Sequence, residues 1–137
     1  MVRLVRKTDS SVPRWDTHGV IREDGTINVH THGLEQYGLK NLEIICEDEE
    51  EAQWGAKVIG QIALSEIDEG KQYAFGQGHV IDDDTTFDIL HAFELEKVVD
   101  EYGDTVAMVD YIYGPVIHPD TGKMYMFNED REWVLIK

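Results

Sequence analysis

The stretch NLEIICEDEEEAQWGAKVIGQIALSEIDEG (residues 41–70) decides the fold, because it predicts a buried strand followed by an amphipathic helix. Residues 41–46 form a short, mostly apolar run, which is typical of a buried strand. After them, small and apolar residues recur every three or four positions, so one face of the predicted helix is apolar. Asp48 is placed to cap its N-terminus and Gly70 to end it. Because Gly55 and several alanines flank or line that face, we expect the helix to lie close against a sheet.

Segments rich in strand-forming residues flank this unit on both sides. Residues 15–22 and 26–32 are joined by a short loop around Gly25. After the helix, residues 71–81 are extended but interrupted by glycines, and residues 96–102 predict one short helical turn. Further strands are predicted at residues 87–95, 105–113, 124–127 and 132–136. The expected fold class is therefore α+β: a mixed, largely antiparallel sheet of about six strands packed against one main helix.

The composition favours one soluble domain. The chain has 137 residues, of which 42% are hydrophobic, and it has neither a repeat nor a linker. We expect a single α+β domain over residues 1–137, with residues 1–14 as a loosely ordered leader. No apolar run approaches the ~20 residues that a membrane helix needs, and the basic start lacks the apolar segment of a secretory signal. Cys46 is the only cysteine, which excludes an internal disulfide and fits a cytoplasmic location without membrane association.

The charge is strongly negative and unevenly spread. Twelve Lys and Arg against 28 Asp and Glu give a net charge of −16. Residues 1–22 hold five basic and two acidic side chains, a net of +3, which leaves −19 for the remainder. This charge argues against direct binding of nucleic acid, because phosphates would be repelled.

The acidic runs differ in whether the local structure explains them. Residues 47–51 fall at the first turn of the predicted helix, where the helix dipole favours anions. No helix terminus explains the acids from residue 82 to residue 104. An acidic surface can attract a basic partner. We therefore expect the residues that bind a basic protein to lie among Asp82, Asp83, Asp84, Glu94, Glu96, Asp100 and Glu101.

The histidines offer a second kind of site. His30 and His32 are two residues apart on a predicted strand, so both imidazoles lie on one face. His18, across the predicted hairpin, or His118 or His79 from elsewhere, would supply a third ligand. Three such ligands with an open position suit a catalytic zinc or another divalent transition metal.

Other motifs fail on inspection. The run Asp82 to Thr86 lacks the glycine and the glutamate of a calcium loop at the required positions. It also lacks the doubly wound context of a haloacid-dehalogenase-like phosphatase. The glycines at 33 and 38 lack the Lys and Ser/Thr of a phosphate loop. Cys46 ends an apolar strand, which predicts a buried hydrophobe rather than a nucleophile. The absence of a catalytic set favours a protein that is not an enzyme.

Two segments carry a family resemblance. Residues 31–34 (Thr-His-Gly-Leu), followed by Tyr37-Gly38 and residues 42–45, resemble the opening of a bacterial family known as domain of unknown function 4262. Residues 117–122 are similar to its Trp-Pro-Asp-x-x-Gly segment, so the likeness spans residues 15–127. His30, residues 39–41 and His118 depart from the family pattern. The resemblance implies a strand, then an Ala-rich helix, and brings no catalytic residues. A looser resemblance to immunity proteins of the suppressor-of-fused type implies a helix on a mixed sheet and an acidic surface.

These observations support three functional hypotheses. The preferred one is an acidic binding module, in its concrete form an immunity or inhibitor protein that engages a basic protein. The first alternative is a small metal-dependent hydrolase centred on His30 and His32, with His18 or His118 completing the site. The second is a nucleic-acid mimic whose carboxylates are spaced like phosphates. The sequence leaves the oligomeric state open.

Overall fold

The computed structural model describes residues 15–100 and 102–137. The expected leader at residues 1–14 and the predicted binding residue Glu101 lie outside the described residues.

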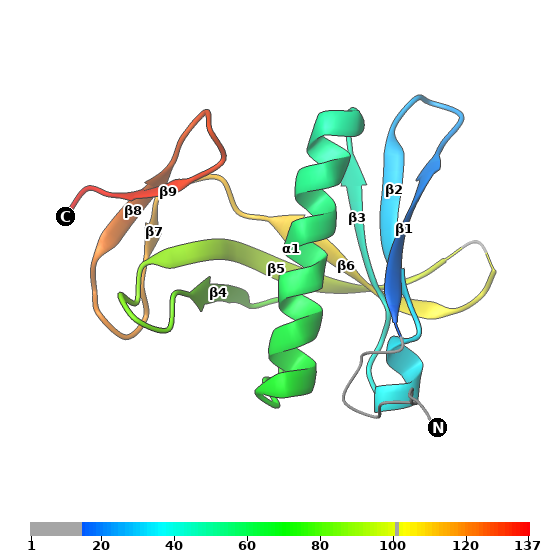
Figure 1. The fold of residues 1–137 in the computed structure, drawn as a ribbon, viewed down its shortest axis with the longest axis horizontal. Helices are drawn as coiled ribbons and strands as arrows, with labels where there is room; N and C mark the ends of the chain where they lie inside the picture. Colours follow the sequence, from blue (N-terminus) through cyan, green and yellow to red (C-terminus); the bar gives the residue numbers. More distant parts are fainter. Residues whose placement is uncertain (1–14, 101) are drawn as a thin grey trace, which may run out of the picture.

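A six-stranded sheet forms the body of the protein (Figure 1), and its strands follow the order β1-β2-β3-β6-β5-β4. β3 and β6 run parallel, whereas the other neighbouring pairs are antiparallel. The mixed, largely antiparallel sheet is therefore confirmed, as is the α+β class. The strands are β1 (Asp16–Ile21), β2 (Ile27–His32), β3 (Leu42–Cys46), β4 (Gly78–Asp82), β5 (Ile89–Val99) and β6 (Thr105–Tyr111).

The main helix, α1 (Glu49–Asp68), crosses one face of this sheet (Figure 1). The Asp48 carboxylate accepts a hydrogen bond from the backbone N–H of Glu51 at 2.8 Å, which confirms the predicted cap. Helix and sheet approach closely at Gly55, where an added Cβ would lie 2.8 Å from the Sγ of Cys46. Only glycine fits there, and the close approach expected from the small residues is confirmed.

The core lies between α1 and the sheet. Alternate residues of β3 are buried against the helix, while Glu43 and Ile45 lie on the opposite, open face of the sheet. Fully buried side chains come from every layer: Leu34, Leu42, Cys46, Val58, Ile59, Ile62, Ala63, Ala92 and Phe93. Leu34 belongs to a short 3-10 helix, η1 (Leu34–Tyr37), between β2 and β3.

A second, three-stranded antiparallel sheet follows the main one and was not predicted as a separate layer. It consists of β7 (Val116–Ile117), β8 (Met124–Phe127) and β9 (Trp133–Leu135). An aromatic cluster attaches it to the body, because the Phe127 ring lies 5.4 Å from that of Tyr111 and 5.1 Å from that of Trp133. Trp54 of α1 joins this cluster at 4.6 Å from Tyr111. Figure 1 shows this small sheet and the β1–β2 hairpin at opposite ends of the molecule.

Two local expectations are wrong. The helical turn predicted at residues 96–102 does not form over residues 96–99, because β5 continues to Val99 and pairs with β6 as far as Thr105. The strand expected from Phe87 begins only at Ile89, since Phe87 is exposed in the loop with a φ of 62°. In the described part of the chain, no helix combines the length and the apolar character needed to cross a membrane.

Candidate functional site

The predicted acidic residues fall into separate places. Asp82 ends β4, and Asp83 and Asp84 continue into the loop that leads to β5. Asp100 follows β5 at its other end. Since β5 has 11 residues, this strand alone spans about 33 Å at ~3.3 Å per residue. The structure therefore brings Asp82, Asp83 and Asp84 together and keeps Asp100 away from them.

Glu94 and Glu96 occupy a third place, along β5. They alternate with the buried Phe93 and Leu95, so their side chains lie on the face of the sheet opposite α1. Cross-strand pairing puts Glu94 beside Asp110 of β6 on that face.

An acidic pocket forms where the loop after β4 meets the C-terminal end of α1. It has a volume of about 360 Å³. Five carboxylates line it: Asp68, Glu69, Asp82, Asp83 and Asp84. Asp68 and Glu69 were not predicted as binding residues. The sequence signal that could have indicated them is the cluster of acids at the end of the predicted helix. Only the tertiary fold places that cluster against the loop after β4.

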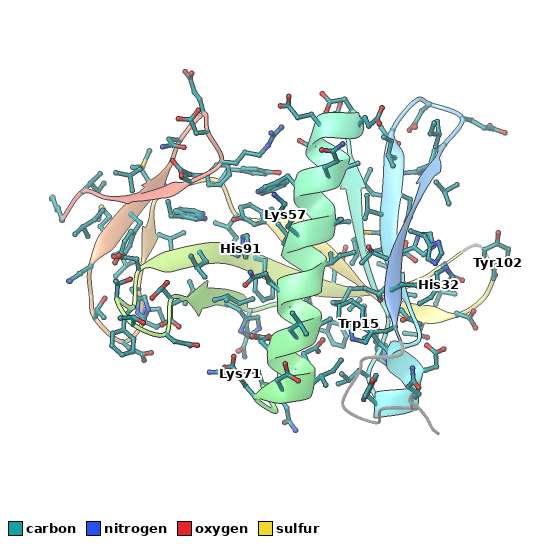
Figure 2. All side chains as sticks on the ribbon, in the orientation of Figure 1. Trp15, His32, Lys57, Lys71, His91 and Tyr102 are labelled. Carbon is teal, nitrogen blue, oxygen red and sulfur yellow. The ribbon has the colours of Figure 1, made fainter. Side chains whose placement is uncertain are left out.

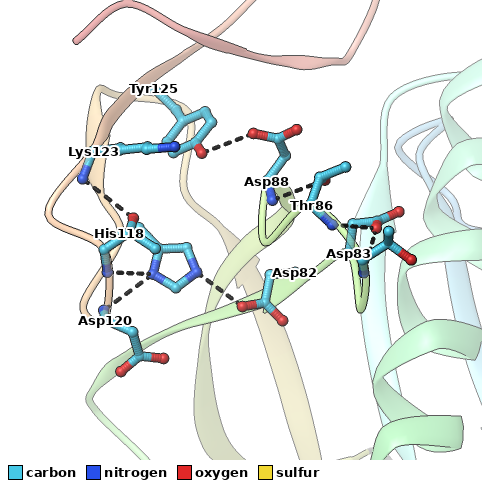
Figure 3. A network of polar contacts seen from close by, with 10 residues as sticks. Asp82, Asp83, Thr86, Asp88, His118, Asp120, Lys123 and Tyr125 are labelled. Atoms are coloured by element: carbon cyan, nitrogen blue, oxygen red, sulfur yellow. Dashed lines mark hydrogen bonds and ion pairs between the residues drawn. The ribbon is translucent and has the colours of Figure 1, made fainter.

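Two of the five carboxylates accept hydrogen bonds that stabilise the local structure (Figure 3). Asp82 accepts a hydrogen bond from the Nε2–H of His118 at 2.9 Å. Asp83 accepts from the backbone N–H groups of Thr86 at 3.0 Å and Thr85 at 2.8 Å. These backbone hydrogen bonds lower the pKa of Asp83, so it is ionised at neutral pH.

The other three carboxylates, Asp68, Glu69 and Asp84, form no side-chain hydrogen bond or ion pair within residues 15–100 and 102–137. No basic residue occupies the last turn of α1. The pocket therefore concentrates negative charge at the negative end of the helix dipole.

His118 lies beside this pocket and has a structural role. It is fully buried, and its Nδ1 accepts a hydrogen bond from the backbone N–H of Asp120 at 3.0 Å. The proton of the neutral ring must then be on Nε2, which donates to Asp82 (Figure 3). One potential ligand atom each from Asp82, His118 and Asp120 lies within 4.8 Å of the others. Because both ring nitrogens already have partners, His118 holds the turn at residues 119–122 to β4.

Three of the four remaining candidate histidines gather on the β1–β2 hairpin. His18 and His30 are directly opposed across the two strands. The ring of His32 lies 4.5 Å from that of His18 and 4.8 Å from that of His30. The structure thus brings together His18, His30 and His32, whereas His118 lies at the other end of the sheet. His79, on β4, instead hydrogen-bonds the carbonyl oxygen of Ala74.

A polar chain orients His30. Its Nδ1 lies 3.0 Å from the Oδ1 of Asn28, and the Nδ2 of Asn28 donates to Glu43 at 2.8 Å. The amide oxygen can only accept, so His30 carries its proton on Nδ1 and its Nε2 acts as an acceptor. That Nε2 lies 3.0 Å from the Nε2 of His32. Burial, together with the neighbouring His32, lowers the pKa of His30 and favours its neutral form.

This histidine cluster borders an open groove on the face of the sheet that α1 does not cover. The groove has a volume of about 1130 Å³ and is bordered by β2, β3, β6 and the end of β5. Asn28, His30, His32 and Glu43 line it together. Figure 2 places His32 on the β1–β2 side of the molecule.

Cys46 is fully buried, and burial raises the pKa of its thiol to about 11, so the thiol is protonated at neutral pH. This confirms the structural interpretation of the cysteine.

Comparison with family models, curated proteins and solved structures finds no match to the chain. The resemblance to domain family 4262 and to immunity proteins stays a prediction.

Proposed function

We propose that this protein is a binding module that engages a basic protein partner, as an immunity or inhibitor protein does, through the acidic pocket at the C-terminal end of α1. The observation that carries the proposal is the set of five carboxylates around one pocket, three of them without a side-chain partner among the described residues.

The electrostatics of α1 supports this assignment. A carboxylate in the last turn of a helix is unfavourable by roughly 0.3–1 kcal/mol, because the helix dipole is negative there. Asp68 and Glu69 both lie at that end, without a basic neighbour in the turn. A cation entering the pocket relieves this repulsion, so binding gains free energy that the isolated protein lacks.

The pocket favours a long basic side chain as the group that enters. Its volume of about 360 Å³ is at the small end of the ~300–1,000 Å³ typical of ligand pockets. An arginine guanidinium pairs with carboxylates through two parallel hydrogen bonds, which a lysine ammonium cannot do. The proposed partner therefore presents an arginine on an exposed loop or helix.

A charge-matched pair of variants tests the proposal. The pocket variant Asp68→Asn/Glu69→Gln/Asp84→Asn removes the three unpartnered carboxylates and keeps Asp82 and Asp83, which hold the local structure. The control variant Glu23→Gln/Glu47→Gln/Glu129→Gln removes the same charge from exposed positions outside the pocket.

The probe is a labelled arginine-rich peptide, and its binding is followed by fluorescence anisotropy at low and at high salt. We expect the pocket variant to lose at least about tenfold in affinity relative to the control, with the difference shrinking as salt screens the charges. Equal affinities of the two variants would show that only net charge matters, and would refute the proposal. Capture from a lysate with the wild type and both variants then identifies the natural partner.

The nucleic-acid-mimic alternative uses the same acids but predicts a different partner surface, one shaped for a row of phosphates. The separation of Asp82–Asp84 from Asp100 along β5 favours a local site over an extended one. The other alternative, a metal-dependent hydrolase, would use the histidine cluster in place of these acids.

A further inference from the structure

We infer that His18, His30 and His32 form a binding site for a divalent transition metal such as Zn²⁺, on the open face of the β1–β2 hairpin. The inference is independent of the acidic pocket, which lies at the other end of the sheet.

The strand register creates this cluster. Residues of a strand that are two apart share a face, and so do directly opposed residues of paired strands. His30 and His32 therefore share a face of β2, and the register places Asp16 opposite His32 and His18 opposite His30. Three imidazoles and one carboxylate meet on a surface of two short strands.

Two ligand nitrogens are already close to the spacing of a metal site. Zinc binds histidine nitrogen at ~2.0–2.1 Å, so two nitrogens of a tetrahedral site are about 3.3 Å apart. The Nε2 atoms of His30 and His32 are 3.0 Å apart. Because the Nε2 of His30 is unprotonated, the Nε2–H of His32 donates this hydrogen bond. A metal ion would take the place of that proton, which would move to the Nδ1 of His32, with little movement of either ring.

The surroundings of His30 are those of an oriented ligand. Histidines that bind a metal through one nitrogen usually donate the other N–H to a fixed acceptor, which sets the tautomer and the direction of the ring. Asn28 accepts the Nδ1–H of His30, and Glu43 holds the Asn28 amide in place. The unprotonated Nε2 is thus directed at His32 before any ion arrives.

His18 is the third ligand. Its Nε2 lies 3.0 Å from a carboxylate oxygen of Asp16, so that nitrogen donates to a carboxylate and leaves Nδ1 as the ligand atom. The His18 side chain is 51% exposed, and an exposed ring rotates on the nanosecond timescale. The three histidines do not place one ligand atom each within 4.8 Å of the others, so closure of the site needs the His18 side chain to rotate away from Asp16.

Three histidine ligands leave a fourth position open. The groove of about 1130 Å³ borders His30 and His32, so that position is accessible to water or to a small ligand. The group formed by Asp82, His118 and Asp120 suits a metal less well, because His118 is fully buried and an ion there would break a hydrogen bond that holds the turn at residues 119–122 to β4.

Calorimetric titration of the untagged protein with ZnCl₂ tests the site, and Co²⁺ serves as a second probe whose visible spectrum reports tetrahedral coordination. We expect one ion per chain. His30→Gln/His32→Gln abolishes binding, His18→Gln weakens it at least tenfold, and Asn28→Ala weakens it by about 10–100-fold. The controls His79→Gln and Asp82→Asn leave the affinity unchanged, and circular dichroism confirms that each variant is folded.

Two results overturn the inference. One is the absence of stoichiometric binding of either ion to the wild type. The other is binding that survives His30→Gln/His32→Gln but is lost in Asp82→Asn, which places the ion at His118. Nuclear magnetic resonance of the wild-type protein gives a test that needs no variant. Added Zn²⁺ must shift the imidazole resonances of His18, His30 and His32 and leave the resonance of His79 unchanged.

Discussion

Glu66 of α1 has a carboxyl oxygen, Oε1, that is buried without a hydrogen-bond partner among the described residues. Burial raises the pKa of this group from 4.5 to about 7. Folding therefore strengthens the binding of its proton. The stabilising contribution is complete below pH 4.5 and is lost as the pH rises through about 7, because the folded state must then hold a partly buried charge.

The substitution Glu66→Gln keeps the shape of the protonated acid and removes the titration. A shift from 4.5 to about 7 corresponds to about 3 kcal/mol at ~1.4 kcal/mol per pH unit. About 2.5 kcal/mol of this falls between pH 5 and pH 8. Because Glu66 is only partly buried, water screens the charge, and we expect about 1–2 kcal/mol.

Urea unfolding at pH 5 and at pH 8, followed by tryptophan fluorescence, measures the effect. The free energy of unfolding of Glu66→Gln minus that of the wild type should increase by this amount from pH 5 to pH 8, and taking the difference cancels the other titrating groups. Glu129→Gln, which changes an exposed carboxylate outside the acidic pocket, is the control and should show no such increase. A difference that is equal at the two pH values, or a variant less stable than the wild type at pH 8, would refute the reasoning.

Three further substitutions test the packing and the polar contacts. Gly55→Ala should lower the free energy of unfolding in urea by about 1–3 kcal/mol, because its Cβ would overlap the Cys46 sulfur, and Cys46→Ala in the same chain should recover part of the loss. Asp48→Ala should cost about 1 kcal/mol in the same assay through loss of the α1 cap, with the exposed, uncharged Gln53→Ala of the same helix as the control. Burial lowers the pKa of His91 from 6.5 to about 4, so its contribution to stability is present above pH 6.5 and is lost as the pH falls towards 4. The wild type should therefore lose up to about 3 kcal/mol relative to His91→Gln between pH 7 and pH 4, and no relative change would contradict this assignment.

The parts of the fold that local sequence determines were predicted. The β3–α1 unit follows from the change in hydrophobic period at Asp48, and its cap and close packing at Gly55 follow from residue type. The parallel pairing of β3 with β6 could not be predicted from local sequence, because it joins residues more than 60 positions apart and depends on tertiary packing. The same tertiary effect extends β5, since pairing with β6 overrides the helical tendency of residues 96–97.

The candidate sites divide in the same way. The shared face of His30 and His32 follows from the strand period, but the choice of His18 over His118 depends on the hairpin register. The contribution of Asp68 and Glu69 to the acidic pocket depends on where a 20-residue helix ends relative to a loop on the sheet. A single sequence carries no direct signal for that distance.

The contact between Gly55 and Cys46 makes the only thiol of the chain a reporter of helix detachment. A fully buried sulfur with a thiol pKa of about 11 reacts with an alkylating reagent only when α1 lifts from β3. The labelling rate at a given reagent concentration therefore measures the free energy of that opening in the unmodified protein. A ligand in the acidic pocket holds the end of α1 against the loop after β4 and should slow labelling. A metal ion on the opposite face of the sheet does not contact α1, so it should leave the labelling rate unchanged when only the helix detaches. The labelling rate of Cys46 therefore distinguishes a ligand in the acidic pocket from a metal ion at the histidine cluster.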